Sequence, residues 1–98
     1  MKTDVSAINE ALASNLSYLK KTYHVEKIGV FGSFSRGEET KSSDIDILIE
    51  FSKPISMFRF IELEEFLSKI LGRKVDLVSK KALKPRIKEQ ILREVRYA

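Results

Sequence analysis

The chain has 98 residues, of which 43% are hydrophobic, and a formal net charge of +4. This length supports one domain with a real core but not two, so we expect a single domain over residues 1–98. The chain contains no cysteine, which excludes disulfides, thiolate metal sites and cysteine nucleophiles. Because no apolar run reaches the ~18 residues of a membrane span and no leader pattern is present, we expect a cytoplasmic location.

Charge is distributed unevenly along the chain. Residues 36–50 carry two basic and five acidic side chains, whereas residues 80–98 carry seven basic and two acidic ones. The middle segment therefore suits a cation, and the final segment suits an anion. Two interpretations of the basic segment remain open, namely a solvated helix face or a surface for RNA, a nucleotide or an acidic protein.

One helix is predicted at the N-terminal end. Apolar side chains recur at steps of three and four from Ile8 to Tyr23, which is the spacing of one helical face. Thr3 or Asp4 can cap the first turn. We expect this helix to continue unbroken to about Tyr23.

Two strands flanking a turn come next. Residues 27–31 form a short apolar run, typical of a strand buried on both faces, which ends at Gly32. A short helical turn can extend from Ser33 to Gly37, and a polar loop follows it. Residues 44–51 then alternate between apolar and polar side chains, which predicts a strand with one buried face.

The second half of the chain predicts a helix, a strand and a final helix. An apolar stripe between residues 60 and 70 is stopped by Gly72. Residues 74–78 form a third strand, interrupted by Asp76, and Pro85 can start the last helix. We expect that helix to pack through Ile87, Ile91, Leu92 and Val95.

The element order predicts an α/β (α+β) domain in which helices flank a small mixed sheet, with the strand order left open. We expect the aromatic side chains of Phe58, Phe60 and Phe66 to lie in the core. An exposed member of this set could instead stack on a base or meet a partner.

The strongest functional signal is a pair of carboxylates, Asp44 and Asp46, two residues apart on a predicted strand. They must project from the same face, roughly 6.6 Å apart along the backbone. At an effective dielectric near 20, they repel each other by roughly 2.5 kcal/mol. A divalent cation would offset this repulsion, and carboxylates without nearby histidine or cysteine favour Mg²⁺, with Mn²⁺ as a substitute.

Asp76 supplies a third carboxylate from a later strand, where we expect it to be partly desolvated. Three carboxylates can hold two metal ions, one activating the attacking oxygen and one stabilising the leaving phosphate. This combination predicts metal-dependent phosphoryl or nucleotidyl transfer.

A glycine-serine turn fits the substrate half of such a reaction. Gly32 lets the backbone approach a phosphate closely, and Ser33 can donate its N–H and its hydroxyl. Arg36 is placed to pair with a terminal phosphate. The Gly-Lys-Ser/Thr phosphate loop and the three-glycine dinucleotide motif are absent, which disfavours the usual kinase and dehydrogenase routes.

Taken together, Gly32-Ser33, then Arg36, then Asp44-x-Asp46 resemble the signature of the minimal nucleotidyltransferases of the DNA polymerase β superfamily. The resemblance implies a polymerase β-like nucleotidyltransferase fold. It also implies that the three aspartates are catalytic metal ligands and that the Gly-Ser pair holds the nucleoside triphosphate. Family members often have alanine at the position of Ser35, a change that we do not expect to disturb the turn.

The resemblance further implies a biological role. Small stand-alone members are typically antitoxins paired with a HEPN-domain ribonuclease, and they are thought to transfer AMP from ATP to a tyrosine hydroxyl of that partner. A second hypothesis is a non-catalytic binding module that neutralises the toxin by covering it. A third, transfer to a small molecule, is weakened by the lack of a second domain to form its pocket.

Overall fold

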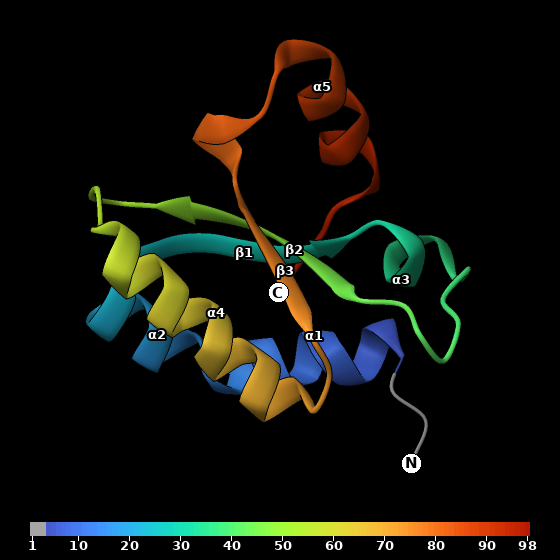
Figure 1. Cartoon of the computed structure of the whole chain (residues 1–98), viewed down its shortest axis with the longest axis horizontal. Helices are drawn as coiled ribbons and strands as arrows, with labels where there is room; N and C mark the ends of the chain where they lie inside the picture. Colours follow the sequence, from blue (N-terminus) through green and yellow to red (C-terminus); the bar gives the residue numbers. More distant parts are fainter. Residues whose placement is uncertain (1–3) are drawn as a thin grey trace.

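The computed structural model describes residues 4–98 and is built around a four-stranded sheet in the order β3-β2-β1-β4 (Figure 1). The strands are β1 (Val25–Phe31), β2 (Ile45–Phe51), β3 (Val75–Ser79) and β4 (Arg96–Tyr97). β1 runs antiparallel to β2 and β4, whereas β2 and β3 are parallel. The predicted mixed sheet is confirmed.

Helices flank this sheet on both sides, as Figure 1 shows. They are α1 (Val5–Ser14), α2 (Leu16–Tyr23), α3 (Ser33–Arg36), α4 (Met57–Leu71) and α5 (Pro85–Glu94), with a short 3-10 turn, η1 (Lys80–Ala82). α1, α2 and α4 cover one face, and α5 stands on the other side. Within residues 4–98, none of the helices combines the length and the apolarity needed to cross a membrane.

The core lies between the sheet and the helices α1, α2 and α4. The alternation in β2 buries Ile45, Ile47 and Ile49 completely in this core. The predicted buried face of this strand is therefore confirmed. Since successive side chains of a strand point to opposite faces, Asp46 projects toward the other side of the sheet.

The expected single N-terminal helix was wrong, because it breaks at Asn15 into α1 and α2. The Asn15 side chain donates a 2.8 Å hydrogen bond to the carbonyl of Ala11. Asparagine side chains compete with the helical backbone in this way, which favours a break. Asp4 caps α1 by accepting a 2.9 Å bond from the N–H of Ala7, and the alternative cap, Thr3, lies outside the described residues.

The predicted helix before Gly72 is confirmed, but its first turn differs from expectation. Ser56 caps α4 by accepting a 3.1 Å bond from the N–H of Arg59. Phe58 in this first turn is 78% exposed, so its expected place in the core was wrong. The first turn projects beyond the sheet, whereas Phe60 and Phe66 reach back to the core.

The last helix begins at Pro85 as predicted, but its expected packing stripe was only partly correct. Ile91 is buried and Val95 is half-buried, whereas Ile87 and Leu92 are 51% and 37% exposed. α5 is attached to the rest of the molecule at its C-terminal end. Solvent reaches Ile87 in its first turn and Leu92 in its last turn, so the exposed apolar side chains are not confined to the free end.

The pairing of β4 with β1 explains a glycine that the motif analysis left without a role. Gly29 pairs with Tyr97, and a Cβ added at Gly29 would lie 2.7 Å from the carbonyl oxygen of Arg96 and 2.9 Å from Cγ2 of Val95. Only a residue without a side chain lets the C-terminal segment cross the sheet this closely. Sequence analysis missed β4 because two residues carry no periodic pattern.

Candidate active site

The three predicted aspartates are brought to one end of the sheet. Asp46 and Asp76 are paired residues on the parallel neighbours β2 and β3, so their side chains project from the same face. Asp44 directly precedes β2 and lies on that same side. Asp46 also pairs with Phe31, the last residue of β1. The turn that follows β1, beginning at Gly32, therefore lies next to these carboxylates.

Gly32 lies directly against Asp46. It has φ 76° and ψ −151° and precedes α3, where it occupies the cap position. A Cβ added at Gly32 would overlap the Oδ2 atom of Asp46. Glycine is therefore needed both for the backbone conformation and for the close approach of the turn that carries Ser33.

The electrostatics of the site centre on Asp46. Burial raises the pKa of the Asp46 carboxyl above its usual value of 3.8, and the negative charges of Asp76 and Asp44 raise it further. The positive charge of Arg36 acts in the opposite direction on the same pKa. The Asp46 carboxyl is thus partly desolvated and lies near the negative charges of two other aspartates.

The expected desolvation of Asp76 was wrong, since its side chain is exposed. β3 is the edge strand of the sheet, and the face that carries Asp76 is left open to water. Asp44 is also exposed and lies 3.9 Å from the ammonium of Lys74. The half-buried carboxylate is Asp46, because it lies on the central strand β2.

The raised pKa of Asp46 leads to a prediction for the metal-free protein. The fold favours the protonated carboxyl, so its contribution to stability is present below the ordinary pKa of 3.8 and is lost as pH rises through the raised value. Relative to Asp46→Asn, the wild-type free energy of unfolding should therefore decline across this range. Urea unfolding of both proteins at a series of pH values measures this, and curves that stay parallel would contradict it.

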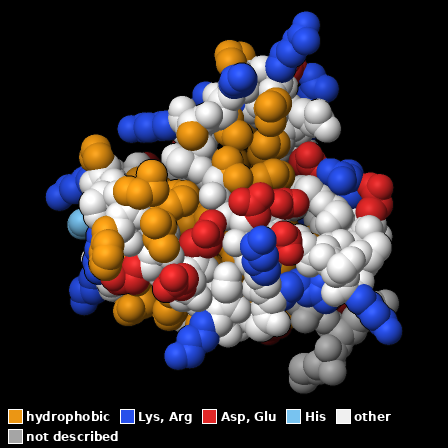
Figure 2. All heavy atoms as spheres, in the orientation of Figure 1, with side chains coloured by type: hydrophobic (Ala, Val, Ile, Leu, Met, Phe, Trp, Pro, Cys, Tyr) orange, Lys and Arg blue, Asp and Glu red, His pale blue; other side chains and the backbone are white. Residues whose placement is uncertain are grey.

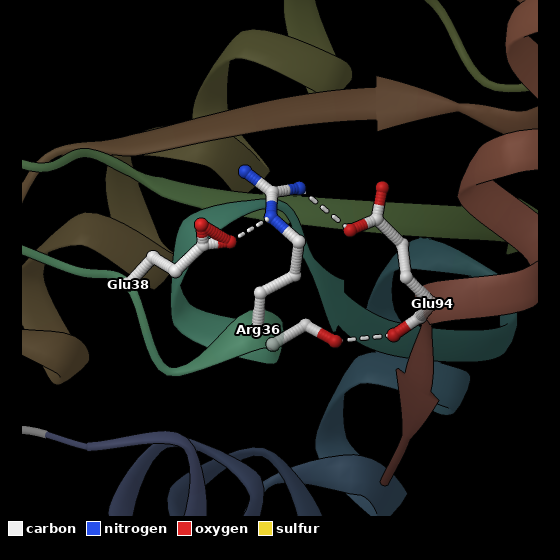
Figure 3. A network of polar contacts seen from close by, with 4 residues as sticks. Arg36, Glu38 and Glu94 are labelled. Atoms are coloured by element: carbon white, nitrogen blue, oxygen red, sulfur yellow. Dashed lines mark hydrogen bonds and ion pairs between the residues drawn. The ribbon is translucent and has the colours of Figure 1, made fainter.

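Arg36 is already engaged by two carboxylates, as Figure 3 shows. Its Nε donates to Glu38 and one terminal nitrogen donates to Glu94, each at 2.7 Å. The Ser35 hydroxyl also donates to the backbone carbonyl of Glu94. These contacts join α3 to the end of α5. The two hydrogen bonds of the Arg36 side chain engage its Nε and one terminal nitrogen, and a phosphate can bind at the other terminal nitrogen.

The roles of Glu38, Glu94 and Ser35 were not found by sequence reasoning. Glu94 lies 58 residues after Arg36, and no spacing rule connects such distant positions. The expectation that Ser35 leaves the turn undisturbed is consistent with α3 extending over Ser33–Arg36. Its buried hydroxyl, however, makes a tertiary contact that alanine could not make.

The donor atoms of the site are of the kind that magnesium prefers, although the described part of the chain alone does not supply a complete set of ligands. Among residues 4–98, no three histidine, cysteine, aspartate or glutamate side chains form a group that could hold a metal ion by themselves. Mg²⁺ commonly uses only one or two carboxylates and completes its shell with water and substrate phosphates. The hard oxygens of Asp46 and its neighbours match that mode, and a cation would offset their accumulated charge.

This fold is that of a nucleotidyltransferase. The model of the nucleotidyltransferase domain family matches residues 9–98, and the chain belongs to this family. A solved structure described as a minimal nucleotidyltransferase is 33% identical, with a TM-score of 0.82 and coverage of 96% of this chain and 95% of that one. The predicted class of enzyme is confirmed.

One further relative has a name that refers to protein modification, and one further solved structure shares the fold. Protein adenylyltransferase MntA of Thermococcus cleftensis is 47% identical over 90 residues, which are 92% of this chain and 91% of the relative. A chain from a solved complex of the tri-AMPylated HEPN toxin of Shewanella oneidensis with MNT antitoxin is 21% identical, with a TM-score of 0.67 and coverage of 92% and 70%. At that identity the likeness concerns the fold alone.

Proposed function

We propose that this protein transfers AMP from ATP to a tyrosine hydroxyl of a partner HEPN-domain ribonuclease and so acts as its antitoxin. The observation that carries the proposal is the contact of the Gly32 turn with Asp46, beside the paired Asp76. In this proposal, the turn binds phosphate and the carboxylates beside it bind Mg²⁺. The relative named protein adenylyltransferase supports AMP as the transferred group.

In this proposal the residues of the chain act mainly by positioning. Gly32 and Ser33 hold the triphosphate through the backbone and the Ser33 hydroxyl, and Arg36 neutralises phosphate charge. Asp44, Asp46 and Asp76 hold one or two Mg²⁺ ions, which Mn²⁺ can replace. The tyrosine oxygen bonds to the α-phosphorus of ATP while its proton is lost to solvent and the bond to the oxygen of the β-phosphate breaks, so that pyrophosphate leaves. When bound, Mg²⁺ would neutralise the phosphate charge.

A second candidate is an antitoxin that neutralises the toxin only by covering it. Both candidates require the chain to bind the toxin. The juxtaposed carboxylates favour the enzyme, since their mutual repulsion is a cost that simple binding does not require.

The two candidates are separated by incubating the chain with its native HEPN partner, α-labelled ATP and Mg²⁺. We expect label on the partner, a mass increase by whole AMP units, and peptide mapping to a tyrosine. Full neutralisation of ribonuclease activity without any mass increase would favour the binding module instead. Omission of Mg²⁺, or its replacement by Mn²⁺, tests the metal requirement in the same assay.

A further inference from the structure

An apolar groove of about 800 Å³ lies at the end of the sheet opposite to the aspartates. Its walls are the C-terminal ends of β2 and β3, the loop formed by residues 52–56, the start of α4, and η1. We call it the η1–α4 groove. Its apolar lining includes Pro54, Ile55, Met57, Phe60, Leu77 and Ala82.

Exposed apolar side chains extend this groove along α4. Met57 and Phe58 are 73% and 78% exposed, and Ile61, one turn further on, is 48% exposed. Figure 2 shows hydrophobic side chains gathered at the end of the molecule where α4 begins. Single exposed apolar residues are ordinary, but a contiguous set beside a groove marks an interaction site.

A basic segment, η1 with the start of α5, follows β3 in the chain, and its residues Lys80 and Lys81 line the groove. Residues 80–88 contain five basic side chains and no acidic one. Lys80 is paired with Glu50 at 3.2 Å, but none of the described residues 4–98 forms an ion pair with Lys81 or Lys84. The lining contains two acidic residues, Glu26 and Glu50. Among the described residues, Glu50 forms an ion pair with Lys80, whereas Glu26 forms none.

The combination of an apolar lining and an adjoining basic segment selects the chemistry of the occupant. A nucleic acid would require basic groups along the floor of the groove and aromatic faces for stacking. Here most of the lining is apolar, and its cations are Lys53, Lys80 and Lys81, of which Lys80 is already paired with Glu50. This arrangement complements a protein segment whose central side chains are apolar and whose flanking side chains are acidic.

We propose that the η1–α4 groove, with Met57 and Phe58, is the docking site for such an acidic-flanked apolar segment of a partner protein. The identity of this partner as the HEPN ribonuclease rests on the proposed function. Asp46 and Glu50 are four residues apart on β2, so the groove begins roughly 13 Å from the aspartates. A partner held there lies close enough to present its acceptor hydroxyl to the site.

The test measures the affinity of the native HEPN partner for the wild-type chain and for two variants. Phe58→Asp should weaken binding by about tenfold or more, since it places a charge in the apolar centre of the interface. Lys81→Glu with Lys84→Glu should slow association and reduce its dependence on salt. Both variants should bind AMP-PNP as the wild type does, because these side chains lie away from the aspartates.

Matched controls come from α2, outside the groove. Tyr18 is 46% exposed, so Tyr18→Ser removes an exposed aromatic side chain elsewhere. Lys20→Glu with Lys21→Glu makes the same change in net charge as Lys81→Glu with Lys84→Glu. We expect both control proteins to bind the partner with wild-type affinity.

Several outcomes would overturn the proposal. Equal affinity of the wild type and Phe58→Asp for the HEPN partner would do so, as would a wild-type chain that does not bind the partner. Sedimentation that shows a dimer lost only in Phe58→Asp, with partner binding unchanged, would assign the groove to a second copy. If Phe58→Asp lost binding to a labelled single-stranded RNA but kept wild-type affinity for the HEPN partner, the groove would be assigned to RNA. Partner binding that follows the expected pattern without any AMP transfer would support the groove and refute only the proposed enzyme.

Discussion

Replacing Asp44 and Asp46 together by asparagine should reduce AMP transfer to the partner by about 10³-fold or more. Both changes remove negative charge from the site where we propose that Mg²⁺ binds. Asp46 is the carboxylate that touches the Gly32 turn and pairs with Asp76. The measurement is the rate of label incorporation from α-labelled ATP at saturating Mg²⁺.

The same double variant should keep its fold. In metal-free buffer its melting temperature should equal or exceed that of the wild type, since the substitution removes the charge whose burial, together with repulsion from Asp76 and Asp44, raises the Asp46 pKa. Its affinity for the HEPN partner should be unchanged. Glu10→Gln with Glu65→Gln, which alters the charge equally at exposed positions on α1 and α4, should retain full transfer. Undiminished transfer by the aspartate variant would refute the site.

Gly32→Ala should damage both stability and transfer. The backbone at φ 76° and ψ −151° lies in a region that is essentially restricted to glycine, where another residue costs about 1–3 kcal/mol. The added Cβ would also overlap the Asp46 carboxylate, so the turn or the carboxylate must move. We expect a lower midpoint of urea unfolding together with a loss of transfer of about 10²-fold, because misplacement of about 1 Å can have that effect.

Gly72→Ala separates backbone strain from damage to the site. Gly72 ends α4 with φ 67°, but a Cβ there would meet no atom within 4 Å, so the alanine adds strain without a clash against the carboxylates. This variant should lose about 1–2 kcal/mol of stability while its transfer rate per folded molecule stays at the wild-type level. If the two glycine variants lost transfer equally, the contact between Gly32 and Asp46 would have no special role.

Local patterns predicted most of the elements. The alternation in β2, the stop of α4 at Gly72 and the start of α5 at Pro85 are all found in the structure. The break at Asn15 was missed because the apolar spacing continues through it on both sides, while a single side chain diverts the backbone. β4 was missed because its two residues are defined by pairing with β1 rather than by any pattern of their own.

The candidate site was predicted as a set of residues but not as an arrangement. The close spacing of Gly32, Ser33, Asp44 and Asp46 made that part of the set visible in the sequence. The sequence did not show which carboxylate is desolvated, and the expectation favoured Asp76. The strand order reverses that expectation, since the edge strand β3 exposes Asp76 while the central strand β2 half-buries Asp46.

The sequence by itself determined the chemistry available to this protein: hard oxygen ligands without thiols, a glycine-serine turn, and a core adequate for one small domain. Only the tertiary structure decided which groups meet. In the folded chain, Asp46 is paired with Asp76, and Gly32 lies in close contact with Asp46. Arg36 also pairs with Glu94, and Phe58 lies in solvent beside an apolar groove. Residue types and short-range periodicity are local properties, whereas these contacts depend on strand order and on the crossing of distant segments.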